Sequence, residues 1–464
     1  MTDSQSALFE VDVFAEAESR RKPHTRCEIR FRSCGPGDLL PRVAGSSIPE
    51  DHAVRLIKAG LDAMALGFLR QRYAHLGGYG YDPLMMLSVA LYGCMQGLRV
   101  GRELQEACLY DDRYRFLAGG LTPDDRTFDR FLERHGLDLD ELLNEVLRFA
   151  RKFGMGRGCE VVADGCKVPC SASWWKYMED AEATPSDPDA RLMNSHGRKM
   201  VGYNALVATD TADGLIVGVE VVNDQNDFHV LPALVEAMYS QLGEDPAAIV
   251  ADKGFDCQEA IQYLEERGID SVIASKSTCY DCFSEDEDGN WCCPAGKALI
   301  VLGSSYKGRN QRYERYGPEG GCRGCPLRSQ CPFFRKRLHL PEGSDLGTKL
   351  RNYRRVHSAT YSGAMLRRRR GETPFAFLRR HDRFERFRGR SLRKARAELR
   401  LWAVSYNLRK ILRAFKSLQK GLLRAFRRQI QPMASMLAAI MQSFAFGMCR
   451  LAAPQLKTEI SLTH

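Results

Sequence analysis

Long apolar runs are missing from this sequence. The two longest, residues 84–98 and 433–449, fall short of the roughly 20 residues that a membrane-spanning helix needs. A signal peptide is missing as well. These absences argue against a membrane or secreted protein, and we expect a cytoplasmic protein with no membrane partner.

Sequence motifs of several common enzyme classes are also absent. The chain has no Walker loop, no dinucleotide-binding fingerprint and no Ser-His-Asp arrangement with supporting motifs. Cysteine, by contrast, is abundant, with 16 residues. Because these cysteines are scattered through a long chain without a secretion signal, we interpret them as thiols in a reducing cytosol rather than as a disulfide scaffold.

Size and charge indicate a multidomain protein with a polyanionic partner. The 464 residues, 44% of them apolar, can bury a large core and predict two or three domains. The net charge of +10 is a modest bias. Between residues 351 and 430, however, roughly 25 basic side chains stand against about 4 acidic ones, which is the positive field that phosphate binding requires.

The sequence patterns divide the chain into six segments. Helical spacing of apolar residues, beginning at the helix-start signal Asp82-Pro83, predicts an all-α domain with helices at 84–98, 101–109, from 122 onward and at 137–153. A further helix is expected at 391–418. The segments are a poorly defined start (1–75), the helical domain (76–155), an α/β domain (156–276), a Cys-rich insertion (277–345), the second part of the α/β domain with basic helices (346–428) and a tail (429–464).

Short apolar runs after residue 160 predict the strands of the α/β domain. These runs lie at 161–163, 202–209, 215–222 and 248–251, with helices expected at 230–242 and 257–267. The turn Thr211-Ala212-Asp213-Gly214 predicts a hairpin between two of the strands. In this order, the strand after the first helix should lie parallel to its partner through a right-handed crossover.

Two of the predicted strands end on an aspartate. Asp164 follows residues 161–163, and Asp252 follows residues 248–251. Because ligands of open α/β sheets gather at the carboxyl ends of strands, both carboxylates are expected to face one crevice. With a third acid they would supply the oxygen ligands that Mg²⁺ prefers. Taken singly, an Asp-Gly pair also fits an ordinary turn.

The surrounding motifs resemble those of insertion-sequence transposases, whose DDE domain has the ribonuclease H fold. The resemblance extends from about residue 81 to about residue 410. It is carried, in the family's order, by Asp164-Gly165, Gly202-Tyr203-Asn204, Asn226-Asp227 and Ala251-Asp252-Lys253-Gly254-Phe255. The stretch from Asp82-Pro83-Leu84 to Arg130-Phe131 looks like the family's N-terminal DNA-binding region. The resemblance thus implies a ribonuclease H-like mixed sheet preceded by an all-α domain.

The family also has a glutamate just before Pro-Phe-Gly in an arginine-rich setting. Here the match is Gly371-Glu372-Thr373-Pro374-Phe375-Ala376, which departs from the family pattern at Thr373 and Ala376. Met365 stands where relatives often have tyrosine, whereas Arg379 keeps the basic residue seven positions after the glutamate. Glu398, on the final predicted helix, is the alternative third acid. The resemblance therefore implies Asp164, Asp252 and Glu372 as catalytic residues.

The resemblance implies a DNA transposase that binds terminal inverted repeats. Its expected reaction is hydrolysis of a phosphodiester at the element's end, followed by attack of the freed 3′-hydroxyl on target DNA, with Mg²⁺ or Mn²⁺ held by the three carboxylates. Double-stranded DNA in the bacterial nucleoid is the expected partner, and a homodimer or larger assembly is expected because two ends are joined. A nuclease without strand transfer and a catalytically decayed DNA-binding protein are the alternatives.

A cysteine cluster lies between the second aspartate and the glutamate, as it often does in such relatives. Cys322 and Cys325 have the spacing of a zinc knuckle, and Cys331 and Cys293 offer two further thiolates. We predict a structural Zn²⁺ bound by these four residues, stabilising an insertion too polar to build its own core. Alternative ligands are Cys279, Cys282 and Cys292.

Arginines flank the predicted glutamate and could hold DNA phosphates beside it. The predicted DNA-binding residues are Arg367, Arg368, Arg369, Arg370, Arg379, Arg380, Arg383 and Arg386. A solvated face is the alternative for such a charge run. Two other features are interpreted as structural: Trp174-Trp175 as a packed apolar pair, and His229 as a helix-start residue.

Overall fold

The structure is a computed structural model, and it describes residues 48–73, 80–172, 184–195, 197–227, 229–275, 282–307, 311–335 and 338–417. Trp174-Trp175, Cys279 and the tail at 429–464 lie outside the described residues, as does most of the segment at 1–75. The chain divides into two compact units, Met1–Ser405 and Tyr406–His464. The sites described below belong to the first unit.

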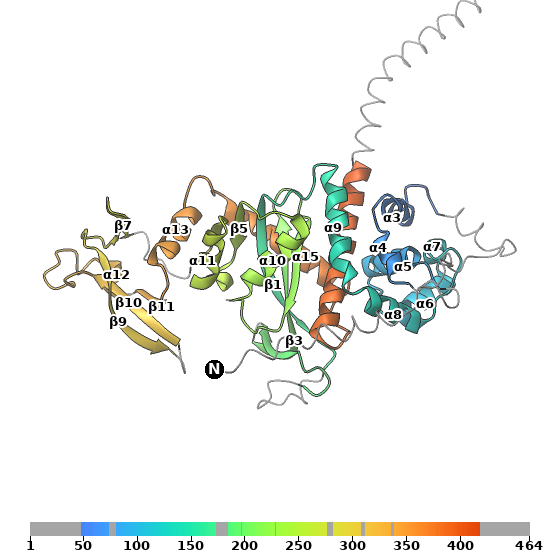
Figure 1. Ribbon diagram of the computed structural model, residues 1–464, viewed down its shortest axis with the longest axis horizontal. Coiled ribbons are helices and arrows are strands. Elements are labelled where there is room, and N and C mark those ends of the chain that lie inside the picture. The colour runs from blue at the N-terminus through green and yellow to red at the C-terminus, as the bar shows by residue number, and fades with distance from the viewer. Residues whose placement is uncertain are drawn as a thin grey trace, which may run out of the picture. The chain divides into compact units, whose positions relative to one another are not determined.

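Helices form the first part of the described chain (Figure 1). Asp82 caps α5 by accepting a hydrogen bond from the Leu84 amide, Pro83 occupies the first turn, and Gly97 ends the helix with a φ of 79°. The predicted helices are confirmed: residues 53–70, where the sequence indicates one short helix, form α3 and α4, and α7 is additional. The helices are α3 (Ala53–Asp62), α4 (Phe68–Gln71), α5 (Pro83–Gln96), α6 (Gly101–Tyr110), α7 (Asp112–Leu117), α8 (Asp125–His135) and α9 (Asp138–Arg151).

Helix α5 is the apolar centre of this helical part. Its residues from Met86 to Met95 are all buried, as expected for a helix surrounded by protein on all sides. Among the described helices, no single one has the length and apolar character to cross a membrane. Helices α5 and α6 together are long and apolar enough, but the pair is bent by 99° at the break between them.

A six-stranded mixed sheet forms the centre of the α/β part. Its order is β2-β3-β1-β5-β6, and β4 pairs with β3. β1 runs antiparallel to β3 and parallel to β5, as the predicted crossover required, and β3 and β4 form the predicted hairpin. This mixed α/β architecture is consistent with a ribonuclease H-like fold. The strands are β1 (Glu160–Pro169), β2 (Arg191–Ser195), β3 (Arg198–Asp210), β4 (Ile216–Val222), β5 (Ala248–Ala251) and β6 (Asp270–Ile273).

β1 corrects one expectation from the sequence, because it does not end at Asp164. Its parallel pairing with β5 stops at Ala163, but its antiparallel pairing with β3 continues to Pro169. The long partner strand therefore keeps the Asp164-Gly165 pair in extended backbone, and no turn forms there. Asp164 lies where β5 stops and β1 continues.

Helices cover both faces of the sheet. α10 (Leu231–Leu242) lies against β4, where Gly218 leaves room for Met238. On the opposite face, α14 (Ala364–Arg367) contacts β5 and α15 (Arg369–Arg380) contacts β1 and β3. α11 (Gln258–Glu266) and α13 (Leu346–Val356) pack beside β6, and a final helix covers residues 392–417.

The Cys-rich insertion is less polar than the sequence indicated, because it has an apolar core that it shares with α13. Its strands form a three-stranded sheet, β11-β10-β9, and a two-stranded sheet, β7-β8. Phe283, Trp291 and Phe333 bury their side chains in one cluster with Leu338, Leu340, Leu346, Leu350 and Tyr353. The elements are β7 (Ser284–Glu285), β8 (Trp291–Cys292), β9 (Leu299–Lys307), β10 (Gln311–Pro318), α12 (Pro332–Arg335) and β11 (Leu338–Pro341).

Candidate active site

Strand register brings the two predicted aspartates together. Ala163 of β1 is paired with Ala251 of β5, and Asp164 and Asp252 are the next residues on these two parallel strands. Each carboxylate accepts a backbone hydrogen bond. Asp164 Oδ1 accepts from the Gly165 amide at 2.9 Å, and Asp252 Oδ1 accepts from the Gly254 amide at 2.7 Å. The two acids therefore sit side by side in fixed orientations.

The predicted glutamate approaches from α15. Glu372 lies in the first turn of this helix, directly after Gly371. A Cβ atom at position 371 would lie 2.6 Å from Cγ1 of Val162 and 3.4 Å from Cβ of Asp164. Glycine thus permits a close approach of the helix to β1. Arg368, one turn earlier, forms an ion pair with Glu372, with 3.4 Å between Nη2 and Oε1.

The pKa of Asp164 reports that the three acids interact. This pKa is raised from 3.8 to about 6, mainly by burial and also by the negative charges of Asp252 and Glu372, whereas the Gly165 amide and the Arg368 charge oppose the shift. Burial and like charges both disfavour the ionised carboxylate. The structure therefore places the three acids that the sequence singled out close enough to influence one another electrostatically, with only part of their negative charge compensated by Arg368 and the backbone amides.

The alternative third acid, Glu398, is engaged elsewhere. Its carboxylate accepts hydrogen bonds from the backbone amides of Arg388, at 2.9 Å, and Gly389. Arg99 lies 3.5 Å away and pairs with the same carboxylate. Burial raises the pKa of Glu398, whereas these two amides and Arg99 oppose the shift. Glu398 thus anchors the loop before the final helix to the helical part of the chain.

Two models of protein families match the chain. The model described as "Transposase DDE domain" matches residues 179–408, and the one described as "Transposase domain (DUF772)" matches residues 42–134. The chain belongs to the DDE transposases. The first match contains Asp252 and Glu372, and it begins after Asp164.

The transposase was also compared with solved structures and with curated proteins. A solved structure that is similar to it is a cryo-EM synaptic complex of piggyBac transposase with hairpin DNA, at 11% sequence identity and a TM-score of 0.30. The match covers 83% of this chain and 77% of that chain. No curated protein matches the transposase.

A lysine that sequence reasoning missed follows Asp164 on the same strand of the transposase. Lys167 of β1 donates a hydrogen bond to Asp227 Oδ1 at 2.7 Å, and the Asn204 side chain donates to the same oxygen at 2.7 Å. A Cβ atom at Gly165 would lie 3.2 Å from this oxygen, so the glycine leaves room for the carboxylate. Asn204 and Asp227 belong to recognised motifs, whereas Lys167 had no local signal.

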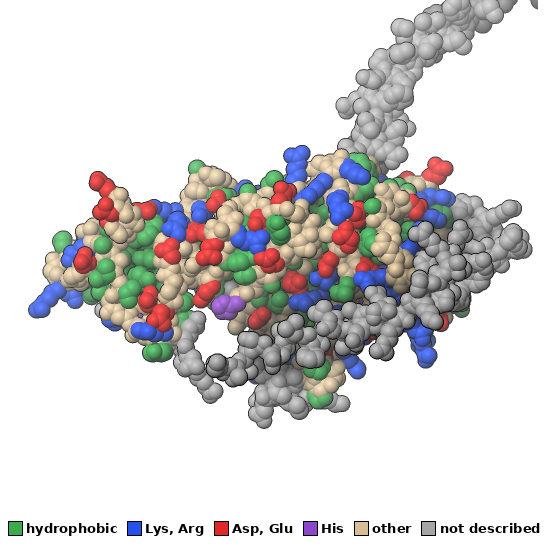
Figure 2. Space-filling view, viewed as in Figure 1, with side chains coloured by type: hydrophobic (Ala, Val, Ile, Leu, Met, Phe, Trp, Pro, Cys, Tyr) green, Lys and Arg blue, Asp and Glu red, His purple; other side chains and the backbone are tan. Residues whose placement is uncertain are grey.

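The predicted DNA-binding arginines fall into two groups. Arg367 forms two hydrogen bonds with the Glu160 carboxylate, at 2.7 and 2.8 Å, and Arg379 donates to Cys166 Sγ at 2.7 Å. The side chains of Arg369, Arg370, Arg380, Arg383 and Arg386 are exposed, and those of Arg367 and Arg368 are partly buried. On the face drawn in Figure 2, basic and acidic side chains are interspersed. Charge alone therefore does not mark a DNA path on that face.

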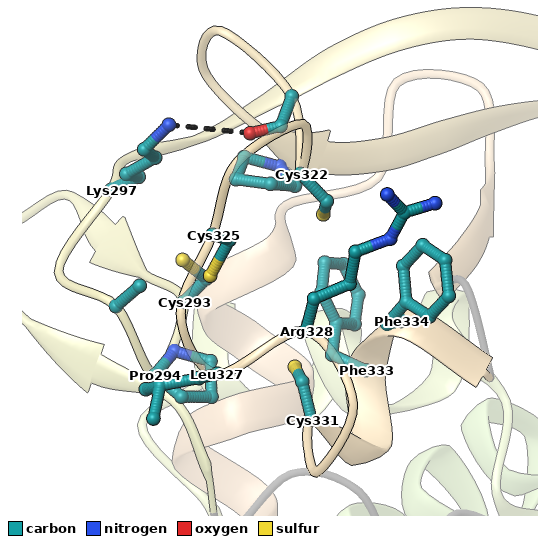
Figure 3. Close-up of a pocket in the computed structure, with 13 residues that line it drawn as sticks. Cys293, Pro294, Lys297, Cys322, Cys325, Leu327, Arg328, Cys331, Phe333 and Phe334 are labelled. Carbon is teal, nitrogen blue, oxygen red and sulfur yellow. Dashed lines mark hydrogen bonds between the residues drawn. The ribbon is translucent and has the colours of Figure 1, made fainter.

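The four predicted zinc ligands line one pocket. Cys293 follows β8, whereas Cys322, Cys325 and Cys331 lie in the segment between β10 and α12, and all four line the same pocket (Figure 3). The pocket has a volume of about 20 Å³, enough for one ion or one water molecule. The four cysteines are free thiols, and the structure does not place their sulfur atoms as close together as those of a formed metal site. Their shared pocket supports the sequence prediction without confirming zinc.

Proposed function

We propose that the transposase cuts a phosphodiester bond at each end of a mobile DNA element and joins the freed 3′-hydroxyl to target DNA. Asp164, Asp252 and Glu372 are the proposed catalytic residues. The observation that carries this proposal is geometric: strand register places Asp164 beside Asp252, and the close contact of Gly371 with Val162 brings α15, and with it Glu372, against the same strand. Family membership supports the same chemistry.

The donor set fits divalent magnesium or manganese. All three side chains offer carboxylate oxygens, which hard cations prefer, and their mutual repulsion is what a cation would relieve. Bound there, Mg²⁺ or Mn²⁺ would supply activation of the attacking oxygen and stabilisation of the leaving oxygen. The amides of Gly165 and Gly254 hold one oxygen of each aspartate, and each carboxylate has a second oxygen to offer a ligand.

The protein's own residues would position the reacting DNA. Arg368 beside Glu372 supplies a positive charge close to the acids. Arg369, Arg370 and Arg380 project from the same helix or its end and are exposed, so we assign them to DNA phosphates. Arg367 forms an ion pair with Glu160 of β1, and we propose that this pair positions α15 relative to β1. The proposed partners are the element ends and target DNA, bound by a homodimer or larger assembly in the bacterial cytoplasm.

For the insertion, we propose one structural Zn²⁺ bound by Cys293, Cys322, Cys325 and Cys331. Four thiolates are a common donor set for structural zinc, and the size of their shared pocket suits a single ion. Because the insertion already has an apolar core, zinc would fix the loops around this pocket rather than the fold of the whole insertion.

A product assay tests this function. Purified transposase is incubated with Mg²⁺, linear DNA that carries the element's ends, and a supercoiled target plasmid. The proposal predicts both cleaved ends and ends covalently joined to the plasmid. Cleaved ends that are never joined would identify a nuclease, and binding without any cleavage would identify a decayed DNA-binding protein.

A further inference from the structure

A second group of metal-binding side chains lies outside the catalytic triad and the cysteine pocket. His229 precedes α10, Cys257 is the residue before α11, and Glu259 lies in the first turn of α11. One ligand atom from each lies within 4.8 Å of the others, and no other trio in the described part of the chain meets this condition. The cluster joins two segments that are 28 residues apart in the sequence.

The distances within this cluster suit a transition metal. Cys257 Sγ lies 3.6 Å from His229 Nδ1. Zinc–sulfur and zinc–nitrogen bonds of about 2.3 and 2.0–2.1 Å at a tetrahedral angle separate the two ligand atoms by roughly 3.6 Å. The Cys257 thiol donates a hydrogen bond to Glu259 Oε2 at 2.6 Å, so a metal would replace the thiol proton and move these two atoms apart.

We propose that His229, Cys257 and Glu259 bind one Zn²⁺, with water at the fourth position. A thiolate and an imidazole favour zinc over Mg²⁺, which prefers oxygen ligands, so this site is chemically distinct from the three carboxylates. Burial and the hydrogen bond to Glu259 raise the pKa of the Cys257 thiol to about 11. Zinc must displace that proton, and binding therefore weakens as pH falls.

Zinc at this position would hold two segments of the active site together. Asp227, two residues before His229, accepts hydrogen bonds from Lys167 and Asn204. Asp252 lies five residues before Cys257, and a Cβ atom at Gly254 would lie 3.5 Å from Asp227 Oδ2. The two segments thus already approach each other beside Asp252. The metal would fix that approach, which makes its three ligands positioning residues rather than catalytic ones.

Zinc content of the purified full-length chain tests this inference. Wild type, His229→Ala, Cys257→Ser and Glu259→Gln are loaded with Zn²⁺ and desalted, and bound zinc per chain is measured by mass spectrometry. Cys159→Ser, which removes an exposed thiol, is the matched control. Cys322→Ser reports on the proposed zinc of the cysteine pocket. Thermal unfolding of each variant verifies that it is folded.

The inference predicts that wild type holds one more zinc per chain than Cys257→Ser, while Cys159→Ser equals wild type. His229→Ala and Glu259→Gln change exposed residues and should weaken zinc binding by more than the roughly 10–100-fold seen on losing outer-shell partners. Cys322→Ser should leave the Cys257-dependent zinc in place. Equal zinc contents in wild type and the three ligand variants, or no zinc in wild type, would overturn the inference. Because the readout is metal content, the result does not depend on catalytic activity.

Discussion

Gly371 lies so close to Val162 that a Cβ atom at position 371 would be 2.6 Å from the valine's Cγ1. Cβ contacts this short are essentially not seen in proteins, so α15 can approach β1 only because residue 371 is glycine. Val162 precedes Asp164 by two residues on the same face of β1, and Glu372 follows Gly371 directly. The contact therefore sets the separation between the glutamate and the aspartate.

Gly371→Ala is expected to abolish most of the cleavage activity while the protein stays folded. Relief of the clash must shift α15, at a cost of about 1–3 kcal/mol in stability. A shift of about 1 Å in Glu372 should lower the cleavage rate by about 10²-fold. Gly60→Ala, in α3 with no atom within 4 Å of the new methyl group, is the control and should cleave normally. Normal cleavage by Gly371→Ala would refute the role given to this contact.

Asp164 is expected to make the stability of the metal-free transposase depend on pH. Its pKa of about 6 in the folded protein, against an ordinary 3.8, means that the folded state keeps the proton to higher pH. The protonated carboxyl of Asp164 therefore contributes to the free energy of unfolding below pH 4. This contribution, about 3 kcal/mol, is lost as the pH rises through 6. Asp164→Asn should therefore raise the unfolding temperature at pH 7 without metal, and much less at pH 4. Asp62→Asn, at an exposed residue, should leave the unfolding temperature unchanged; the same behaviour in Asp164→Asn would contradict the account.

The two groups of arginines should differ in how salt affects DNA binding. Arg380→Ala removes an exposed charge, so it should weaken DNA binding and reduce the slope of log K against log salt by about 0.9. Arg367→Ala should keep the slope, because this arginine is paired with Glu160, and should instead lower the unfolding temperature. Binding titrations at several salt concentrations separate the two effects. If both variants change the slope equally, Arg367 contacts DNA phosphates as well, which would contradict the account.

Removal of zinc should loosen the cysteine pocket without unfolding the insertion. Trp291 lies in an apolar cluster built from aromatic and leucine side chains, and of the four thiols Cys331 packs against its edge, so the buried environment of Trp291 should persist after chelation. Alkylation of Cys322 and Cys325 should become faster at the same time. Mass spectrometry of the alkylated thiols and tryptophan fluorescence measure the two responses. Exposure of Trp291 on chelation would mean that zinc, and not the apolar cluster, supports the insertion.

Local signals predicted the elements that carry the site. Asp82-Pro83 begins α5 as expected, and β5 has the bounds 248–251 that its apolar run indicated. The Asp-Gly signal at Asp164 failed because pairing with the long strand β3 outweighs the local preference for a turn. The expectation that Asp164 and Asp252 lie side by side is nevertheless confirmed, because both follow the last paired residues of β1 and β5.

Long-range packing accounts for what the sequence did not reveal. The core of the insertion combines Phe283 and Trp291 with Phe333, which lies far along the chain, so no short window shows an apolar period. Lys167 donates a hydrogen bond to Asp227, 60 residues away in the sequence, and His229 contacts Cys257, 28 residues away. Neither pair has a spacing motif. Such contacts follow from the tertiary structure alone.

The central claim is that Asp164, Asp252 and Glu372 together perform metal-dependent cleavage. Its most direct test compares binding and cleavage of element-end DNA in Mg²⁺ by Asp164→Asn, Asp252→Asn and Glu372→Gln, with Glu398→Gln as the matched acid outside the triad. All four variants should bind the DNA. The first three should lose cleavage by several orders of magnitude, and Glu398→Gln should cleave at temperatures where it is folded. Undiminished cleavage by any of the three, or loss in Glu398→Gln with Glu372→Gln active, would contradict the account.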